Sequence, residues 1–250
     1  MLAINIIINI IILINLTLIA GILPLIERKY LSLIQRRVGP TFVGYKGRLQ
    51  FIADALKMFL KGCIVPNKVN HLYFFFFPAC VLSICYLFWL NNFWGLNIIY
   101  IELEYNLVFL SILSLFINIL IILTGFVSNN KYSILSAARV ILIMFCLELL
   151  LNLLLLNIYV IANSFNLANN LLLQQEFGTI TIFFWCYSLI IIVTLLEINR
   201  SPFDLAEAES ELIAGFHVEY GAFFFGLFYL GEYFHLFFFS ITIIIMFIGI

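Results

Sequence analysis

Residues 196–219, which read LEINRSPFDLAEAESELIAGFHVE, separate two long apolar runs of the chain. This segment carries six acidic residues and one basic residue, although charged residues make up only 10% of the whole chain. Hydrophobic residues account for 65% of the sequence, and the mean hydropathy is +1.17. A soluble domain is only about half apolar and about a quarter charged, so the composition indicates an integral membrane protein. Acidic side chains between membrane spans are costly, which marks residues 196–219 as a candidate functional segment.

The apolar runs on either side belong to a series long enough to cross a bilayer, whose hydrocarbon core requires about 20 apolar residues in a helix. The first run has no basic region before it and no cleavage site of small residues, so we expect it to be retained as a span. The sequence therefore predicts an all-α, polytopic transmembrane helix bundle that forms a single membrane domain over residues 1–250. The predicted spans are six in number: 4–26, 72–92, 107–127, 140–161, 180–196 and 220–248.

The basic residues orient this bundle, because all twelve fall in loops on one side of it. Nine lie in the loop 27–70, Lys131 and Arg139 lie between the third and fourth spans, and Arg200 lies between the fifth and sixth. The opposite side carries acidic residues and no Lys or Arg. By the positive-inside rule, the basic loops face the cytoplasm or the mitochondrial matrix, and we expect both termini on the other side.

The first inside loop, 27–70, is long enough to have a function of its own. Apolar residues recur at helical spacing over residues 49–60, and Asp54 with Lys57 forms an i,i+3 pair of opposite charge, so we predict an amphipathic helix here. One interpretation is a helix that lies on the lipid surface. The other is that Arg28, Arg36 and Arg37 line a docking surface or the mouth of a cavity for an amphipathic ligand.

The second inside loop, 197–219, also predicts a short helix, which begins at Ser201-Pro202 because Ser can cap a helix and Pro fits its first turn. At 100° per residue, Asp204, Glu207 and Glu211 fall on one face of this helix. Glu209 points toward the apolar face, which is unusual for a helix that is merely solvated on one side.

Further glutamates continue from this loop into the predicted spans: Glu148 near mid-membrane, Glu197 at the end of the fifth span, Glu219 at the start of the sixth and Glu232 well inside it. Carboxylates close together cannot all ionise, so they can exchange protons near neutral pH. We favour a proton path over isolated structural glutamates, and over a cation channel, whose mouth would not need nine basic residues. The three histidines and five cysteines predict neither a haem nor a metal site, because only His235 lies inside a span and no C-x-x-C pair occurs.

Three segments closely resemble NADH dehydrogenase subunit 1, the membrane-arm subunit of respiratory complex I that lies beside the peripheral arm. The matching residues are Glu27-Arg28-Lys29, Gln35, Arg37, Gly39-Pro40, Val43-Gly44, Gln50, Ile52-Ala53-Asp54-Ala55 and Lys57; Ser128-Asn129, Tyr132 and Ala138-Arg139; and Glu197, Asn199-Arg200, Pro202-Phe203-Asp204-Leu205-Ala206-Glu207, Glu209-Ser210-Glu211-Leu212, Gly215-Phe216, Glu219-Tyr220 and Glu232-Tyr233. The resemblance covers essentially the whole chain, and the third segment is nearly diagnostic of the family.

The resemblance implies a component of proton-translocating NADH:ubiquinone reductase that has no complete active site alone. It implies that ubiquinone enters from the bilayer through a tunnel in this component, and that the chain binds no flavin, haem, iron–sulfur cluster or metal. By the resemblance, the quinone-tunnel residues are Arg28, Arg37, Asp54 and Lys57. The residues expected to couple quinone chemistry to protons are Glu148, Glu197, Arg200, Asp204, Glu207, Glu209, Glu219 and Glu232.

Two departures from the family pattern stand out. Val38 occupies a position that is usually basic, and family members normally have eight spans whereas six are predicted here. We therefore expect that a separate polypeptide, as from a split mitochondrial gene, supplies the last two helices, or that the sequence is a fragment.

The resemblance also implies partners and a location. The expected partners are the peripheral-arm subunits of the quinone site, neighbouring membrane-arm subunits and membrane lipids, with no nucleic acid. The expected location is the mitochondrial inner membrane, with both termini on the intermembrane-space side. Two alternatives stay open: the homologous membrane subunit of a hydrogenase-type complex, and a structural membrane anchor for a peripheral arm.

Overall fold

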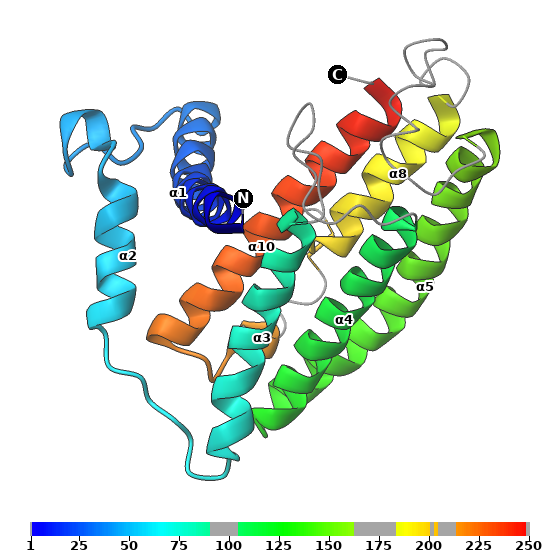
Figure 1. Cartoon of the computed structure of the whole chain (residues 1–250). Helices are drawn as coiled ribbons and strands as arrows, with labels where there is room; N and C mark the ends of the chain where they lie inside the picture. The colour runs from blue at the N-terminus through cyan, green and yellow to red at the C-terminus, as the bar shows by residue number, and fades with distance from the viewer. Residues whose placement is uncertain (1, 91–104, 163–183, 201–202, 205–213, 249–250) are drawn as a thin grey trace.

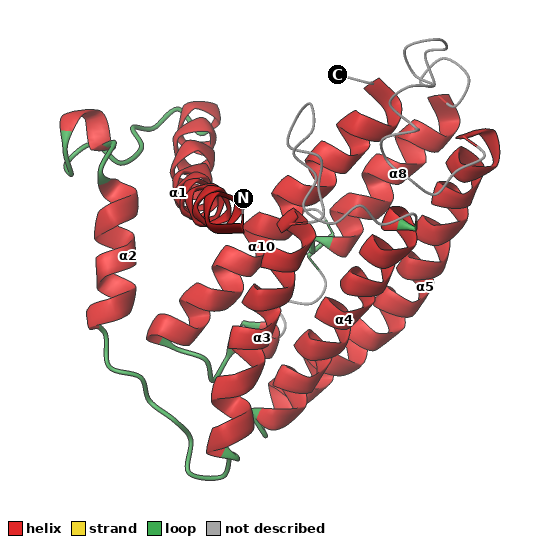
Figure 2. Ribbon diagram, in the orientation of Figure 1, coloured by secondary structure: helices red, strands yellow, loops and turns green. Residues whose placement is uncertain are grey.

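The computed structural model describes residues 2–90, 105–162, 184–200, 203–204 and 214–248, and in these ranges every regular element is a helix and none is a strand (Figures 1 and 2). This confirms the predicted all-α fold. The main helices are α1 (Leu2–Ile34), α2 (Gln50–Leu60), α3 (His71–Leu90), α4 (Asn106–Val127), α5 (Lys131–Ala162), α8 (Phe184–Glu197) and α10 (Ala222–Ile243). Short helical turns cover Tyr45–Gly47 and Gly215–His217, and α10 continues as a π-helical turn over Ile244–Ile248.

Five of these helices are long and apolar enough to cross a membrane, namely α1, α3, α4, α5 and α10. The remaining predicted span corresponds to α8, a shorter apolar helix of 14 residues in the described part of the chain. Residues 180–183, where we expected this span to begin, lie outside the described residues. The amphipathic helix predicted in the first inside loop is present as α2.

Two helices extend well beyond the apolar runs that predicted them. Helix α1 continues past residue 26 to Ile34, and α5 begins at Lys131 rather than at residue 140. Arg28 and Arg139 therefore lie on helices, and not in the loops that the sequence predicted. Long basic side chains can keep their aliphatic stems against apolar surface while their charges reach the polar layer, so a helix can continue past the hydrocarbon core.

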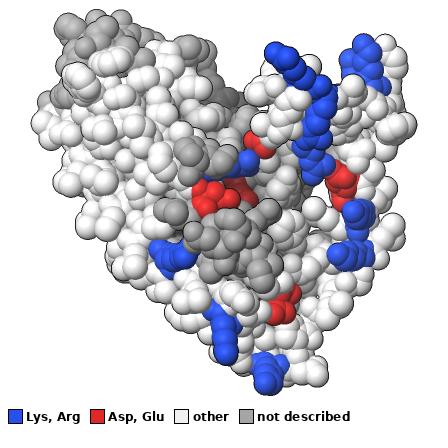
Figure 3. All heavy atoms as spheres, turned by 180° about the vertical axis from the view of Figure 1, so that it is seen from behind, with Lys and Arg blue, Asp and Glu red and all other residues white. Residues whose placement is uncertain are grey.

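Helix α10 is the centre of the arrangement, because it packs against α1, α2, α3 and, less extensively, α8. From α3 the bundle continues through α4 and α5 to α8, while α1 and α2 stand on the opposite side of α10 (Figure 1). In the space-filling view, Lys and Arg gather over the side formed by α1, α2 and the adjoining loops and along the lower edge of the molecule, whereas the described residues of the upper opposite surface are uncharged (Figure 3).

Small residues allow α4 and α5 to approach closely near the turn that joins them. A Cβ atom added at Gly125 would lie 2.8 Å from the Cβ of Ala137. The hydroxyl group of Ser133 donates a hydrogen bond of 3.0 Å to the Gly125 carbonyl, and it also bonds the Ser128 hydroxyl. Interfaces of small and hydroxyl-bearing residues are typical of helix pairs in membranes, where apolar burial provides no driving force between helices.

Candidate functional site

A cavity of about 340 Å³ lies between α1, α2 and α10. Its walls are mainly apolar and include Phe51, Met58 and Leu227. Gly21 on α1 and Gly226 on α10 also line it, and a Cβ atom at Gly226 would come within 2.9 Å of the Met58 sulfur. The three polar side chains in the wall are those of Arg28, Asp54 and Tyr229. The cavity can therefore hold an apolar chain and offers a few polar contacts to one end of it.

Arg28 and Asp54 form an ion pair at the wall of this cavity. The Arg28 guanidinium lies 2.7 Å from the Asp54 carboxylate, and the Gln50 amide donates a second hydrogen bond of 3.1 Å to it. The predicted pair between Asp54 and Lys57 was wrong, because the continued helix α1 brings Arg28 across to α2. Asp54 is paired with this guanidinium instead.

The structure brings together only part of the predicted tunnel set. Arg28 and Asp54 line the cavity, whereas Arg37 and Lys57 are exposed and are not among its lining residues. The Arg37 guanidinium instead donates a hydrogen bond of 2.7 Å to the side-chain oxygen of Gln35.

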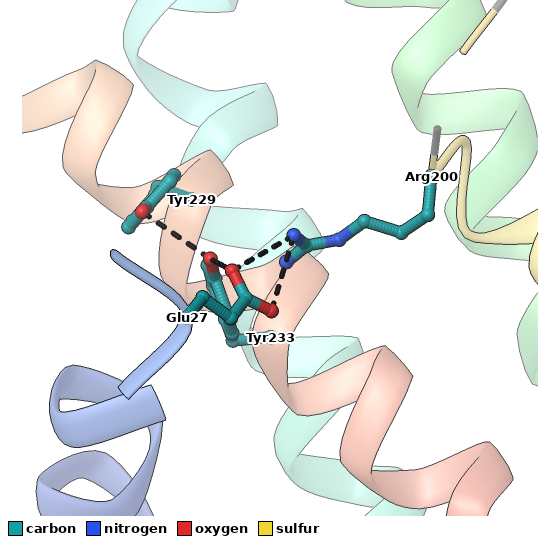
Figure 4. Close-up of polar contacts among 4 residues, drawn as sticks. All are labelled: Glu27, Arg200, Tyr229 and Tyr233. Atoms are coloured by element: carbon teal, nitrogen blue, oxygen red, sulfur yellow. Dashed lines mark hydrogen bonds and ion pairs between the residues drawn. The ribbon is translucent and has the colours of Figure 1, made fainter. Parts of the chain in front are cut away.

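A second polar cluster joins three segments that are distant in sequence (Figure 4). Arg200 follows α8 and lies 3.1 Å from the carboxylate of Glu27 on α1. Tyr233 on α10 donates a hydrogen bond of 2.6 Å to the same carboxylate, and its ring faces the Arg200 guanidinium at 4.5 Å. The hydroxyl of Tyr229, one turn earlier on α10, lies 3.3 Å from that of Tyr233. Glu27 therefore connects α1 to both α10 and the segment after α8.

Arg200 stays charged in this cluster. Burial alone lowers the pKa of Arg200, but its contacts with Tyr233 and Glu27 outweigh burial and raise the pKa above its ordinary value. The side chains of Arg200 and Glu27 are 28% and 38% exposed, so the ion pair is neither fully buried nor fully solvated. A pair in this position contributes more than an exposed surface pair but avoids the full desolvation cost of a buried one.

The backbone after α8 fixes where Arg200 points. Asn199 has a positive φ of 52°, and its N–H bonds the Leu196 carbonyl while the Arg200 N–H bonds the Leu195 carbonyl. This is the Schellman arrangement that ends many helices, in which Asn replaces the more usual Gly at the left-handed position. The Phe203 N–H then closes a turn onto the Arg200 carbonyl at 2.8 Å.

The acidic helix predicted from Ser201-Pro202 does not begin there. Phe203 and Asp204 are described and are not helical, and the Phe203 N–H bonds the Arg200 carbonyl instead. Residues 201–202 and 205–213 lie outside the described residues, and the predicted positions of Glu207, Glu209 and Glu211 lie among them.

Glu148 and Glu197 meet in the interior, with exposed fractions of 3% and 2%. The Glu148 carboxylate accepts hydrogen bonds from Ser114 at 2.9 Å and Asn118 at 3.3 Å. The Glu197 carboxyl group is a near neighbour of both Glu148 and Asn118, yet its two oxygens have no hydrogen-bond partner among the described residues. Two buried carboxyl groups this close cannot both carry a charge at low cost, so the pair can hold a proton between its members.

Both glutamates were predicted from the sequence, but their hydrogen-bond partners on α4 were not. Ser114 and Asn118 are four residues apart, which places them on one face of a helix that is otherwise strongly apolar. Two polar residues four positions apart within an apolar span would have been enough to predict that Ser114 and Asn118 face a polar group in the interior.

A much smaller cavity of about 30 Å³ continues from Glu197 toward α10. Asn118, Glu197 and Glu232 line it. At its edge, the His217 Nε2 atom lies 3.2 Å from the Glu232 carboxylate, and His217 is buried. Nothing in the sequence assigned His217 a functional role. No periodicity links residues 217 and 232, because their meeting depends on how the turn Gly215–His217 folds back onto α10.

Glu219 follows the turn Gly215–His217 and is held by a side chain from the connection between α4 and α5. The Asn130 side chain, in the connection between α4 and α5, donates a hydrogen bond of 2.7 Å to the Glu219 carboxylate. The next residue, Tyr220, stacks on Phe74 with ring centroids 4.2 Å apart, and burial raises the pKa of the Tyr220 hydroxyl above its ordinary value. Of the predicted proton-coupling residues, the structure thus gathers Glu148 with Glu197, and places Arg200, Glu219 and Glu232 in separate polar contacts.

The chain matches the family described as NADH dehydrogenase over residues 6–250. It is 49% identical over 241 residues to NADH-ubiquinone oxidoreductase chain 1 of Paramecium tetraurelia, and the match covers 96% of this chain and 92% of that protein. It is 37% identical to the protein of the same name from Chondrus crispus, with 84% and 65% covered. It is 38% identical to that of Branchiostoma lanceolatum, with 91% and 72% covered. The matched region thus spans most of the first relative and a smaller part of the other two.

Proposed function

Because the chain belongs to the NADH dehydrogenase family, we propose that it works as a membrane subunit of respiratory complex I. Its role there is to form part of the path by which ubiquinone enters from the bilayer, and to couple quinone reduction to proton translocation. The proposal places it in the mitochondrial inner membrane with both termini on the intermembrane-space side. The one-sided distribution of Lys and Arg supports this orientation.

The cavity between α1, α2 and α10 carries the quinone part of the proposal. A prenylated quinone has a long apolar tail and a small polar head, and it leaves the bilayer only where an apolar passage replaces lipid. The apolar wall formed by residues such as Phe51 and Met58 suits the tail. The polar groups of Arg28 and Tyr229 in the same wall suit the oxygen atoms of the head.

The polar groups beyond the cavity carry the coupling part of the proposal. Arg200 lies three residues after Glu197, so the cluster that holds Arg200 near the cavity also anchors the chain next to the Glu148–Glu197 pair. A change at the Glu27 carboxylate can therefore reach a carboxyl pair able to take up or release a proton. Glu232 and His217 extend this set of groups along the smaller cavity.

Substitution of Gly21 by Val tests the quinone path. Gly21 lines the cavity, and a Cβ atom there would make only an ordinary contact with Phe51 at 3.6 Å, so the helix accepts a side chain that narrows the passage. We expect the rate of NADH oxidation by long-tailed ubiquinone to fall about tenfold or more. NADH oxidation by an artificial acceptor that bypasses the quinone site should stay unchanged.

The matched control is Gly62→Val, because an added Cβ atom at Gly62 meets no atom within 4 Å and Gly62 does not line the cavity. This variant should oxidise NADH with ubiquinone at the rate of the unsubstituted complex. If Gly21→Val did the same in a fully assembled complex, the cavity would not be the quinone path.

The proposed partners are the peripheral-arm subunits that complete the quinone site, neighbouring membrane-arm subunits and lipid. We also propose that two further helices of the family pattern pack beside this bundle, supplied by a second polypeptide or by a longer form of this chain. On α5, Leu142, Phe145 and Leu149 are 72%, 68% and 68% exposed and lie along one face, which suits contact with lipid or another subunit. A map of the complete complex without two such helices beside this chain would contradict this part.

A further inference from the structure

Tyr229 belongs to two features at once. Its side chain lines the cavity between α1, α2 and α10, and its hydroxyl group is the outer member of the cluster in Figure 4. On the cavity side, Arg28 and its partner Asp54 line the same wall as Tyr229. Tyr229 therefore stands between the Arg28–Asp54 pair and the Glu27–Arg200 pair.

The hydrogen bonds of the cluster have a direction. The Glu27 carboxylate can only accept, so Tyr233 donates its proton to Glu27. The Tyr233 oxygen is then the acceptor for the hydroxyl of Tyr229. The order of donation runs from Tyr229 to Tyr233 to Glu27, and Arg200 approaches the same carboxylate from the other side.

The two hydroxyl contacts differ in length. The bond from Tyr233 to Glu27 is 2.6 Å, as expected for a hydroxyl that donates to a charged acceptor. The contact between the Tyr229 and Tyr233 hydroxyls is 3.3 Å, which is long for this kind of bond. The hydrogen bond from Tyr229 to Tyr233 is therefore the weaker of the two, and a ligand in the cavity can replace it more easily than the bond from Tyr233 to Glu27.

We propose that Tyr229 is a positioning residue which reports the presence of a quinone in the cavity to Arg200. A quinone oxygen that reaches the wall accepts the hydrogen bond of the Tyr229 hydroxyl in place of Tyr233. The Tyr233 ring is then held less firmly, and so is the Arg200 guanidinium that faces this ring. This inference rests on the proposed function, because it requires a quinone in the cavity.

The transmission follows from the chemistry of the chain of bonds. Hydrogen bonds in series strengthen one another, so the bond from Tyr233 to Glu27 weakens once Tyr233 no longer accepts from Tyr229, and the Tyr233 side chain is held less firmly in place. The ring of Tyr233 also faces the guanidinium of Arg200, so a shift of this ring acts on Arg200 directly. The Arg200 N–H bonds the last turn of α8, and the Arg200 carbonyl accepts the N–H of Phe203. A change at Arg200 therefore acts on the end of α8 and on Phe203, at the start of the acidic segment.

Tyr229→Phe separates this role from simple packing. The ring of Tyr229 packs against those of Phe225 and Tyr233, and Phe preserves both contacts while it removes the hydroxyl. The matched control is Tyr73→Phe on α3, because Tyr73 stacks on Phe77 in a comparable way but does not line the cavity.

The experiment measures amide hydrogen exchange of the peptide that contains Arg200, in the assembled complex, with and without saturating decylubiquinone. A photoreactive ubiquinone analogue reports in parallel whether the cavity is occupied. In the unsubstituted complex and in Tyr73→Phe, we expect decylubiquinone to raise the exchange rate about threefold or more. In Tyr229→Phe, we expect the exchange rate to be raised already without the quinone, and decylubiquinone to add no further change.

Two kinds of failure are distinguishable. If the analogue labels residues of the cavity wall but exchange responds to decylubiquinone equally in Tyr229→Phe, or does not respond in the unsubstituted complex, Tyr229 is not the reporter and the quinone path stands. If the analogue labels no residue of the wall in the unsubstituted complex, the quinone path itself is wrong, and the inference falls with it.

Discussion

Replacing Glu27 with Gln removes one negative charge from the cluster and leaves its shape nearly unchanged. Glu27 accepts one hydrogen bond from Tyr233 at 2.6 Å and pairs with Arg200 at 3.1 Å. Hydrogen bonds to charged groups contribute about 1.5–3 kcal/mol, and neutral ones about 1 kcal/mol. Because the two ionic side chains are 28% and 38% exposed, solvent reduces the difference, and we expect a loss of about 1–2 kcal/mol. The ratio of molecules in which Arg200 is bound to residue 27 to those in which it is released should then fall by a factor of about 5–30.

Cleavage by an arginine-specific protease measures that ratio directly. When a segment opens and closes faster than it is cut, the cleavage rate follows the population of the open form. The rate of cleavage after Arg200 should therefore rise by a factor of about 5–30 in Glu27→Gln. Lys61→Gln is the control, because Lys61 is exposed and removing its charge leaves the cluster intact. A change of less than about twofold in Glu27→Gln would refute the claim that this carboxylate holds the segment after α8.

Three further predictions address packing, the smaller cavity and pH. Gly125→Val should destabilise the complex by about 1–3 kcal/mol, since the added Cβ would lie 2.8 Å from that of Ala137; thermal unfolding checks this, and an unchanged midpoint would contradict it. His217→Asn should lower the number of protons moved per NADH oxidised more than the oxidation rate, because it removes the contact of 3.2 Å between the His217 ring and the Glu232 carboxylate; equal loss of both would instead indicate damage to the quinone path. The pKa of Arg200 is raised by Tyr233 and Glu27 against the effect of burial, so its charge is lost only as pH rises through that raised pKa. Cleavage after Arg200 should thus not increase between about pH 6 and pH 9.

Hydropathy predicted the spans because the bilayer imposes a length on every helix that crosses it. The same reasoning placed Glu148 inside a span and Glu197 at the end of one, and both are buried in the structure. What hydropathy could not show is where helices end, since a helix can leave the hydrocarbon core and continue in the polar layer. Helix α1 does so as far as Ile34, and this continuation is what carries Arg28 to Asp54.

The Glu27–Arg200 contact could not be predicted from the sequence. The two residues are 173 positions apart: Glu27 lies on α1, and Arg200 follows the end of α8. Their meeting depends on the packing of α10 between them and on the left-handed conformation of Asn199, which turns the chain back at the end of α8. Charge counting assigned Arg200 to the basic side of the bundle but gave no information about its partner.

The Asp54–Lys57 prediction failed for a related reason. Residues three apart on a helix can pair, but such pairs on a surface contribute only a few tenths of a kcal/mol. A guanidinium from a neighbouring helix that also lines a cavity offers a planar donor at 2.7 Å, and the carboxylate of Asp54 pairs with it instead. Local spacing therefore predicted the helix α2 correctly and its ion pair wrongly.

The most direct test of the proposed quinone path is a density map of the assembled complex with a long-tailed ubiquinone bound. We expect density for the isoprenoid tail between α1, α2 and α10, in contact with Phe51 and Met58, with the Tyr229 hydroxyl turned toward the quinone. Density for the quinone elsewhere, with this cavity filled by lipid or by side chains of another subunit, would contradict it.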